Sequence, residues 1–328
     1  MIAVLGAFDG FHRGHAHLFE HAREMATSLG TEWGGVTFDP IPGYYMGMIE
    51  NVLFSSRERE LIQYTLGIPR LVVLKFDDEL AHLSPERFWQ YLREQVSIDG
   101  IVIGRDFCFG HRRTGDAKML ERYCREAGVT FLLVDLLQHM NAKISSSAIR
   151  AEVEAGQCES AARELGYPYF ILAKVGRGQG RGRKLGFPTA NLDVPGIKLI
   201  PPEGVYAVAV LVEGAWRGGA LSIGKNPTFD DVPDPRIEVF VLDYNGDLYD
   251  DSLLVFFLSY LRPQTQFKDV RQLSLQIERD VERARVTFKN SFNASDYSGF
   301  IRGYAGMNPL PGDRPHVTDA QQEGEVWR

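Results

Sequence analysis

One stretch decides the fold of the N-terminal half of this chain: Gly6-Ala7-Phe8-Asp9-Gly10-Phe11-His12-Arg13-Gly14-His15. It directly follows the apolar run Ile2–Leu5 and opens an amphipathic stretch that reaches about Leu29, so a strand, a glycine-bearing turn and a helix follow one another. Glycine lets the backbone approach a ligand closely, and the first N–H groups of a helix have no partner inside it. This order is typical of phosphate-binding sites, and a nucleoside triphosphate would fit it.

Four histidines lie in this stretch and in the helix that it opens: His12, His15, His17 and His21. His12 and His15 are three residues apart and therefore share one helix face. A zinc site is a competing interpretation, but no Cys or Glu completes a ligand set of the usual spacing. A plain helix cap is another, although Ser, Thr, Asn or Asp would cap a helix better. We therefore expect both imidazoles to face a bound phosphate.

Length and composition suit about two globular domains, since the chain has 328 residues of which 44% are hydrophobic. The three cysteines, Cys108, Cys124 and Cys158, are odd in number and widely spaced, which favours free thiols in a reducing compartment. We therefore expect a cytoplasmic protein. The apolar run at residues 253–258 is far shorter than the roughly 18 residues of a membrane span, so no membrane partner is expected.

The net charge of −7 argues against extended nucleic-acid binding, because that mode needs a surplus of Lys and Arg. Small anionic ligands need only local positive patches. Residues 105–113 and 177–184 supply two such patches, although short basic runs are also common in solvated loops. We expect small-molecule ligands rather than a nucleic acid.

Up to about residue 155, short apolar runs alternate with helical periodicity, which is typical of a doubly wound α/β fold with a mostly parallel sheet. Helices are expected to begin near Ser55, Ser84 and Asp116, because Ser55 has capping-box spacing to Glu58 and Pro85 follows Ser84. Ligands of such sheets bind at the carboxyl ends of the strands. The expected strands are residues 2–5, 35–38, 71–76, 101–103 and 131–136.

Three hydroxyls, Ser145, Ser146 and Ser147, precede a helical stretch that contains Arg150. Hydroxyls and free N–H groups at a helix start, with a cation about one and a half turns further on, suit the β- and γ-phosphates of a bound nucleotide. A serine cluster of this kind is equally compatible with a plain helix cap.

The pattern changes after a helical stretch at residues 158–165. Sequential strand-like runs joined by Gly, Pro and Asp turns indicate a compact antiparallel barrel, followed by a helix at residues 273–284. The glycines of residues 176–183 are no dinucleotide fingerprint, because Gly186-Phe187-Pro188 breaks any following helix. The expected strands are residues 169–175, 205–212, 220–223, 237–242 and 253–258.

The first motif, G-x-F-D-G-x-H-x-G-H, resembles the nucleotidyltransferase signature of the bacterial bifunctional riboflavin kinase/FAD synthetase family. Three later blocks resemble the same module in order: Thr37-Phe38-Asp39-Pro40-Ile41-Pro42, Val102-Ile103-Gly104-Arg105-Asp106-Phe107-Cys108-Phe109-Gly110 and Ile144-Ser145-Ser146-Ser147-Ala148-Ile149-Arg150. The resemblance implies a Rossmann-like FAD synthetase domain over residues 1–158. Its activity would be adenylyl transfer from ATP to FMN, which gives FAD and pyrophosphate.

In that reaction the phosphate of FMN would attack the α-phosphate of ATP. With a second pKa of about 6 it is largely dianionic at neutral pH, so no general base is needed. The site must instead align two anions and stabilise the charge on the leaving pyrophosphate. By resemblance, His12, His15 and Arg150 with Mg²⁺ would grip the triphosphate, and Asp106 would lie near the nucleotide. The other expected ATP- and phosphate-binding residues here are Gly6, Phe8, Asp9, Gly10, Gly14, Ser145, Ser146 and Ser147.

A second resemblance covers about residues 164–288. Leu185-Gly186-Phe187-Pro188-Thr189-Ala190-Asn191-Leu192 resembles the P-T-A-N motif of riboflavin kinase, and residues 204–206, 222–229 and 237–240 resemble further blocks of that module. The segment from residue 261 to the helix at 273–284 completes it. The resemblance implies an antiparallel Greek-key β-barrel riboflavin kinase domain with a C-terminal helix.

Kinase chemistry needs a base, because the 5′-hydroxyl of riboflavin is not ionised at neutral pH. Glu238 falls at the place of the family's catalytic Glu, although a surface carboxylate paired on a strand is a plain alternative. Thr189 and Asn191 offer neutral oxygens suited to the Mg²⁺ that bridges ATP phosphates. The expected ATP-binding residues of this half are Gly180, Arg183, Gly186, Pro188, Thr189 and Asn191.

Three positions depart from the family pattern. Ile41 stands where a His is common, Asp250 where a Gly usually follows Leu-Tyr, and Gln264 lies in a segment that commonly carries Glu and Lys. Residues 291–328 are rich in Gly, Pro, Asp, Asn and Gln without periodicity, so we expect a flexible tail.

The sequence therefore predicts a two-domain transferase that converts riboflavin to FMN and FMN to FAD with Mg²⁺ and ATP. Its small-molecule partners would be riboflavin, FMN and ATP. One alternative is that only one module is active, or that the first module serves another adenylyl acceptor, which the P-T-A-N module argues against. The other alternative is a flavin-binding sensor without catalysis, which the motif residues argue against and the departures near Gln264 favour.

Overall fold

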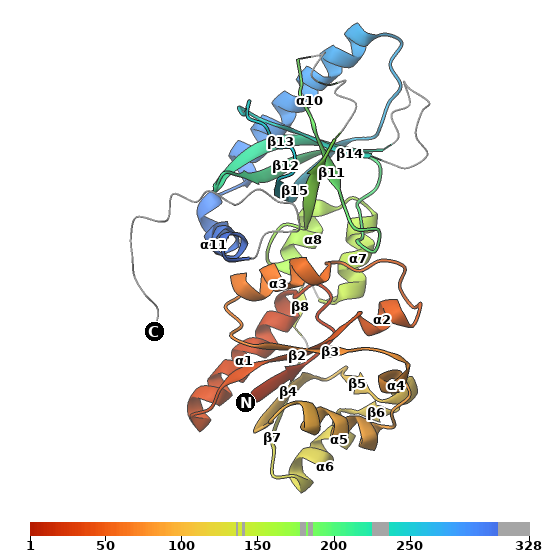
Figure 1. The fold of residues 1–328 in the computed structure, drawn as a ribbon, viewed down its shortest axis with the longest axis vertical. Coiled ribbons are helices and arrows are strands. Elements are labelled where there is room, and N and C mark those ends of the chain that lie inside the picture. The colour runs from red at the N-terminus through yellow and green to blue at the C-terminus, as the bar shows by residue number, and fades with distance from the viewer. Residues whose placement is uncertain (136, 140–141, 178–181, 183–185, 225–235, 308–328) are drawn as a thin grey trace. The chain divides into compact units, whose positions relative to one another are not determined.

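The computed structural model describes residues 1–307 except 136, 140–141, 178–181, 183–185 and 225–235. The chain divides into two compact units (Figure 1). Unit 1 consists of residues 1–149 with Glu164–Gly166, and unit 2 consists of Arg150–Arg163 with the described residues from Tyr167 onward. The boundary lies inside the helix α7 (Ser146–Glu154), and each unit has a hydrophobic core of its own.

Unit 1 is built on a five-stranded parallel sheet in the order β3-β2-β1-β4-β7. The predicted doubly wound sheet is confirmed. Helices α1 and α3 lie on one side of the sheet, and α5 and α6 lie on the other (Figure 1). The strands are β1 (Ile2–Leu5), β2 (Trp33–Asp39), β3 (Leu71–Lys75), β4 (Gly100–Gly104) and β7 (Thr130–Val134). The last residue of the predicted strand 131–136 lies outside the described residues.

The helix α1 (Arg13–Leu29) packs on the centre of this sheet because its apolar face carries Phe19, Ala22 and Ala26. Gly35 makes the close approach possible, since a Cβ at this position would lie only 3.0 Å from the Phe19 ring. The helix ends at Gly30, which caps it in the left-handed conformation at φ 64°. This packing holds the first turn of α1 at the carboxyl end of β1.

The predicted helix starts are confirmed. Ser55 caps α3 (Ser56–Thr65) in a full capping box with Glu58, and Ser84 and Asp116 accept N–H groups at the starts of α5 (Pro85–Gln95) and α6 (Ala117–Glu126). The shorter elements of this unit were not foreseen. They are α2 (Pro42–Tyr45), α4 (Asp78–Ala81), η1 (His111–Arg113), β5 (Cys108–Phe109), β6 (Gly115–Asp116), β8 (Gln138–His139) and β9 (Ala142–Lys143).

Unit 2 is an antiparallel barrel, as predicted. It is closed, with its strands in the order β10-β11-β14-β13-β12-β15. One strand was not predicted from the sequence. It is β11 (Ala190–Asp193), which closes the barrel between β10 and β14. The remaining elements are α8 (Cys158–Leu165), β10 (Phe170–Gly176), β12 (Gly204–Val212), β13 (Ala215–Gly224), β14 (Arg236–Val241), β15 (Ser252–Arg262) and α10 (Val270–Ser291).

The prediction of a flexible tail from residue 291 is wrong for the described residues that follow α10. They form η2 (Ala294–Tyr297) and α11 (Ser298–Gly306). Phe300 is 2% exposed and its ring lies 5.0 Å from Phe256 and 5.5 Å from Phe170. Aromatic side chains of this otherwise polar segment thus pack on the barrel. Burial of their apolar area stabilises a helix that the composition of the segment does not predict. Residues 308–328 of the predicted tail lie outside the described part.

Candidate functional site

The turn between β1 and α1 is strained and holds two stacked imidazoles. Phe8 and Phe11 have φ angles of 49° and 42°, a region that bulky residues rarely adopt, and both rings are fully buried. His12 is the N-cap of α1, and its Nδ1 accepts the N–H of His15 at 3.3 Å. The His12 and His15 rings stack with their centroids 3.7 Å apart. His12 therefore both caps α1 and stacks on His15.

Both imidazoles are neutral at physiological pH. Burial, assisted by the nearby Lys143 ammonium, lowers the pKa of His12 to about 4, and burial together with His12 and Lys143 lowers the pKa of His15 well below its usual value. Because Nδ1 of His12 accepts a hydrogen bond, its proton is on Nε2. Nδ1 of His15 is buried without a hydrogen-bond partner among the described residues.

The lowered pKa of His12 predicts a loss of stability in acid. The unfolded chain protonates His12 near pH 6.5, whereas the folded chain keeps it neutral down to about pH 4, so the folded state binds fewer protons between these values. The free energy of unfolding therefore falls as the pH drops through this window, by about 2 kcal/mol at pH 5. Urea unfolding of wild type and His12→Asn at pH 7 and pH 5 measures this, because Asn keeps the cap without titrating. Equal pH dependence in both proteins would contradict the prediction.

Glycines of the turn make room for its rings. A Cβ at Gly6 would lie 2.7 Å from the Phe8 ring, and a Cβ at Gly14 would lie 3.1 Å from two atoms of the His12 ring. Gly10 has a φ of 120°, which only glycine adopts readily. These predicted phosphate-binding glycines are therefore also required by the turn itself.

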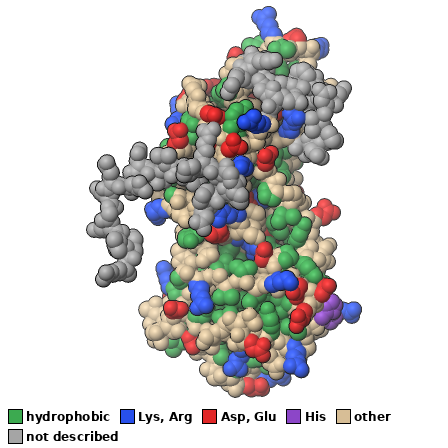
Figure 2. All heavy atoms as spheres, viewed as in Figure 1, with side chains coloured by type: hydrophobic (Ala, Val, Ile, Leu, Met, Phe, Trp, Pro, Cys, Tyr) green, Lys and Arg blue, Asp and Glu red, His purple; other side chains and the backbone are tan. Residues whose placement is uncertain are grey.

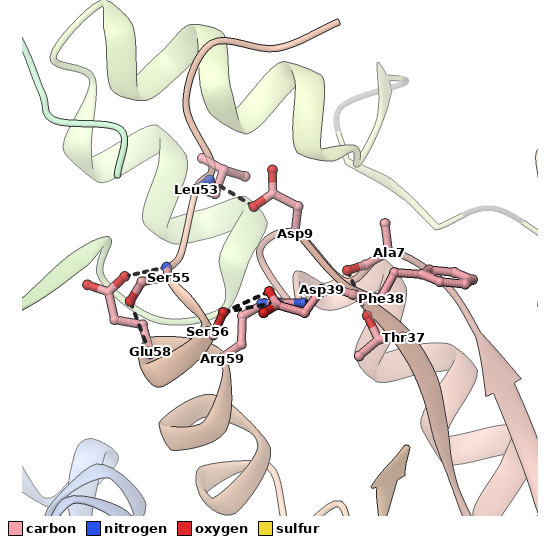
Figure 3. Close-up of polar contacts among 10 residues, drawn as sticks. All are labelled: Ala7, Asp9, Thr37, Phe38, Asp39, Leu53, Ser55, Ser56, Glu58 and Arg59. Atoms are coloured by element: carbon pink, nitrogen blue, oxygen red, sulfur yellow. Dashed lines mark hydrogen bonds and ion pairs between the residues drawn. The ribbon is translucent and has the colours of Figure 1, made fainter. Parts of the chain in front are cut away.

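The carboxylate of Asp9, which was predicted to bind phosphate, holds the neighbouring loop. It is 5% exposed, and its Oδ1 accepts the Leu53 N–H at 2.8 Å (Figure 3). The Thr37 hydroxyl donates to the Ala7 carbonyl at 2.9 Å in the same view, and the Ser146 hydroxyl donates to the Asp9 carbonyl at 2.6 Å. Two separate segments thus bind the backbone of the turn, and the Asp9 side chain binds a third.

A buried arginine that was not predicted from the sequence lies beside the turn. Arg59 of α3 is 4% exposed, and its guanidinium donates to the Phe38 carbonyl at 3.1 Å and to Asp39 Oδ1 at 2.7 Å (Figure 3). Ser56 also donates to Asp39, at 2.8 Å. One feature of the sequence could have pointed to Arg59, because it lies on the inward face of α3 with the buried Leu61 and Ile62. These bonds anchor the end of β2 at the carboxyl edge of the sheet.

The later motifs of unit 1 meet this turn from another side. A Cβ at Gly14 would lie 3.9 Å from the Ile144 carbonyl. The segment that continues into Ser145, Ser146 and Ser147 therefore runs beside the turn that holds His12 and His15. Asp106 forms an ion pair with Lys143, which was not predicted. Ser145 accepts the N–H of Ala148 at 3.2 Å, which is a cap at the start of α7. Phe8 lies in the turn between β1 and α1, and Ser147 lies in the first turn of α7. Arg150 follows in α7 and is the first residue of unit 2.

In unit 2 the predicted catalytic carboxylate and the P-T-A-N motif share one face of the barrel wall. The Thr189 hydroxyl donates to Glu238 Oε2 at 2.9 Å. Asn191 on β11 and Ser222 on β13 are the direct cross-strand neighbours of Glu238 on β14. Since Ile237, Val239 and Val241 are buried in the barrel and Glu238 is half-buried, these polar groups lie on the outer face.

A cavity of about 330 Å³ opens beside Thr189 and Pro188, within the size range of small-molecule sites. Its other lining residues are Val175, Gly182, Ala190, Val239, Val241, Tyr244, Asn245, Gly246, Asp247, Leu248 and Tyr249. Gly186, predicted to bind ATP, has a φ of 84°, and the predicted Gly180 and Arg183 lie outside the described residues.

The structure accounts for two of the three departures. Asp250 has a φ of 66°, so it occupies a backbone conformation that glycine adopts at no cost and that Asp tolerates. The Gln264 amide donates to the Ser222 hydroxyl at 2.7 Å and to the Ile223 carbonyl at 3.1 Å, which ties the segment after β15 to the strand beside Glu238. Ile41 is 4% exposed and buried in unit 1. Nothing in the structure explains why Ile stands where a His is common in the family.

The described residues contain no group of three or more His, Cys, Asp or Glu side chains that could hold a metal ion. The oxygen atoms of Thr189, Asn191 and Glu238 on one face nevertheless suit a hard cation that keeps most of its ligands from water and phosphate. Within the same described ranges, no helix is long and apolar enough to cross a bilayer.

Comparisons with known proteins agree for both units. A family model for FAD synthetase matches residues 1–148, and one for riboflavin kinase matches residues 165–288. Bifunctional riboflavin kinase/FMN adenylyltransferases from Bacillus subtilis and Listeria monocytogenes are 35% and 33% identical over 88% of this chain and 93% and 92% of their own length. A solved structure described as a macrolide-efflux protein from Streptococcus pneumoniae is similar with a TM-score of 0.77 and 30% identity, over 87% of this chain and 93% of the other.

Proposed function

The chain belongs to the bifunctional riboflavin kinase/FMN adenylyltransferase family, and from that premise we propose how its two units divide the work. The enzyme phosphorylates riboflavin to FMN and adenylylates FMN to FAD. We place FMN adenylyltransferase activity in residues 1–158 and riboflavin kinase activity in residues 164–288. The observation that carries this assignment is that the FAD synthetase model lies within unit 1, that all but the first two residues of the riboflavin kinase model belong to unit 2, and that each unit holds its own polar site.

In the adenylyl-transfer site, the neutral His12 and His15 act as hydrogen-bond donors rather than as cations. The FMN phosphate attacks the α-phosphate of ATP, a P–O bond forms, and the bond to pyrophosphate breaks. The Nε2–H of His12 is free to donate to the phosphate oxygens on which charge grows, and the ring of His15 is held beside it by stacking. Arg150 and the serines at the start of α7 are proposed to hold the departing pyrophosphate.

In the kinase site, Glu238 is the proposed base for the riboflavin 5′-hydroxyl. The hydroxyl gives its proton to the carboxylate while its oxygen bonds to the γ-phosphorus, and ADP leaves with the electrons of the broken bond. Thr189 holds the carboxylate through its 2.9 Å hydrogen bond, so Glu238 presents a fixed acceptor. Gly180, Arg183 and Gly186 remain proposed ATP-binding residues, of which Gly180 and Arg183 lie outside the described residues.

Thr189 and Asn191 are the residues proposed to hold Mg²⁺ in the kinase site, because their neutral oxygens share the face of Glu238. When bound, the ion neutralises charge on the phosphates of ATP. The protein's own contribution is to keep these oxygens on rigid strands, since β11 and β14 pair directly at Asn191 and Glu238.

Location and partners follow from the chemistry of the chain. Cys108, Cys124 and Cys158 are free, and burial raises the pKa of Cys124 and Cys158 to about 12, which suits a reducing cytoplasm. On the face drawn in Figure 2, basic and acidic side chains are interspersed rather than gathered in one basic field, which supports small-molecule partners over a nucleic acid.

A chromatographic time course of riboflavin with Mg-ATP and purified protein tests the proposal. We expect FMN to rise first and FAD to follow, with ADP formed in the first step and pyrophosphate in the second. FMN without FAD, even from supplied FMN, would leave only the kinase unit active. Flavin binding without either product would show a non-catalytic flavin-binding protein instead.

A further inference from the structure

A second cavity lies in unit 1, along the helix α1. Its volume is about 440 Å³, within the size range of small-molecule sites. One wall is a face of α1 between residues 13 and 23, and the facing residues are Trp33, Leu66, Ile68 and Leu137. We call this cavity the α1 groove. Its described lining includes none of the residues predicted to bind phosphate in the adenylyl-transfer site, so that site does not account for the groove.

Much of the α1 groove is lined by apolar and aromatic side chains. The rings of Phe19 and Trp33 lie with their centroids 6.3 Å apart and at 54° to each other. Leu66 and Ile68, from the turn between α3 and β3, add aliphatic surface. Phe19 and Ile68 are buried, whereas Trp33 is half-buried, so part of the indole stays accessible. A concave surface of this kind favours a flat apolar group.

Two exposed arginines give the α1 groove its charge. Arg13 is the first residue of α1, and Arg23 lies ten residues further on, about three helical turns away. Among the described residues neither guanidinium forms an ion pair, whereas the nearby Arg70 is paired with Glu32. The N-terminus of a helix carries partial positive charge, so Arg13 does not stabilise α1 through the helix dipole. An anion beside Arg13 would neutralise both charges.

Glu20 limits where an anion can lie in the α1 groove. It is the carboxylate of the described lining, so two arginines against one glutamate leave a surplus of one positive charge. Glu20 lies between Arg13 and Arg23 along α1, and like charges repel, so an acidic group is favoured at an end of the groove rather than in its middle. The planar guanidinium of an arginine can bind a carboxylate there through two parallel hydrogen bonds.

We propose that the α1 groove binds an aromatic acid, whose ring lies on Trp33 and whose carboxylate pairs with Arg13 or Arg23. A neutral aromatic molecule would leave both guanidinium groups without a partner, and an inorganic anion would leave the apolar lining exposed to water. The combination of the two features therefore selects an amphipathic anion. The site is additional to the two catalytic sites, because its described lining shares no residue with either of them.

A titration with 2-naphthoate tests the proposal on protein whose tryptophans carry ¹⁵N. The chain has four tryptophans, and Trp33→Phe identifies the indole N–H signal of Trp33 by its loss. We expect 2-naphthoate to shift this signal in the wild-type protein, with the same Kd when FAD and ADP occupy the catalytic sites. The neutral isostere 2-naphthamide should bind about 10-fold more weakly, because it lacks the charge-assisted contact.

Arginine variants locate the anion. Arg13→Gln combined with Arg23→Gln should raise the Kd for 2-naphthoate about 10-fold, and the single variants show which arginine is responsible. Arg125→Gln, at an exposed arginine of α6 on the other side of the sheet, is the matched control and should bind as wild type does. A Trp33 signal that does not move, equal Kd values for the acid and the amide, or an unchanged Kd in the double variant would overturn the proposal. The titration reports binding alone, so its outcome is independent of both proposed activities.

Discussion

Glu238→Gln should lower the rate of FMN formation from riboflavin by about 10²- to 10⁴-fold, the usual contribution of a positioned general base. Gln keeps the size of the side chain and an oxygen that can accept the Thr189 hydroxyl, but it cannot take a proton from the ribityl hydroxyl. FAD formation from supplied FMN should stay at the wild-type rate, because His12 and His15 of the adenylyl-transfer site belong to the other unit.

The structure makes this a clean experiment. Glu238 is half-buried on β14 between Asn191 and Ser222, so the change leaves the barrel interior untouched. Glu278→Gln on the exposed side of α10 is a matched control with the same loss of one charge. If Glu238→Gln kept a tenth or more of the kinase rate, Glu238 would be only a carboxylate paired with Thr189, and another base would have to be sought.

The sequence predicted the elements whose signals are local. Capping residues marked the starts of α3, α5 and α6, and apolar runs marked the long strands of both units, because these patterns depend on neighbours within a few residues. The strand β11 was missed because its sequence, Ala190–Asp193, is short and only half apolar, and pairing with β10 and β14 forms it. The helix α11 was missed for the same reason, since it depends on burial of Phe300 against the barrel.

The candidate sites were predicted by residue type but not by partner. The motif pointed to His12 and His15, yet only the fold shows that His12 caps α1 with its own ring and that both rings are neutral. A pKa depends on burial and on charges distant in sequence, and Lys143 lies more than a hundred residues after His12. Gln264, in a segment that departs from the family pattern, is likewise explained only by its contacts with Ser222 and Ile223.

His15→Ala should stop the reaction sequence at FMN. Removal of one positioned donor from a site that stabilises developing charge typically costs about 10²- to 10³-fold in rate, and His15 also supports the His12 ring by stacking at 3.7 Å. In a time course started from riboflavin, the variant should accumulate as much FMN as the wild-type protein converts to FAD. Riboflavin phosphorylation itself should proceed at the wild-type rate.

A matched control is available on the same helix. His17 lies two residues further along α1, and its ring lies against His21 rather than against the turn, so His17→Ala should form FAD normally. His15→Ala also removes the edge-on contact with Phe8, so its thermal unfolding must be measured beside its rate. Wild-type FAD formation by a folded His15→Ala protein would mean that the imidazole only packs on Phe8. A loss of rate in a protein with unchanged unfolding would instead support contact between the His15 ring and the triphosphate.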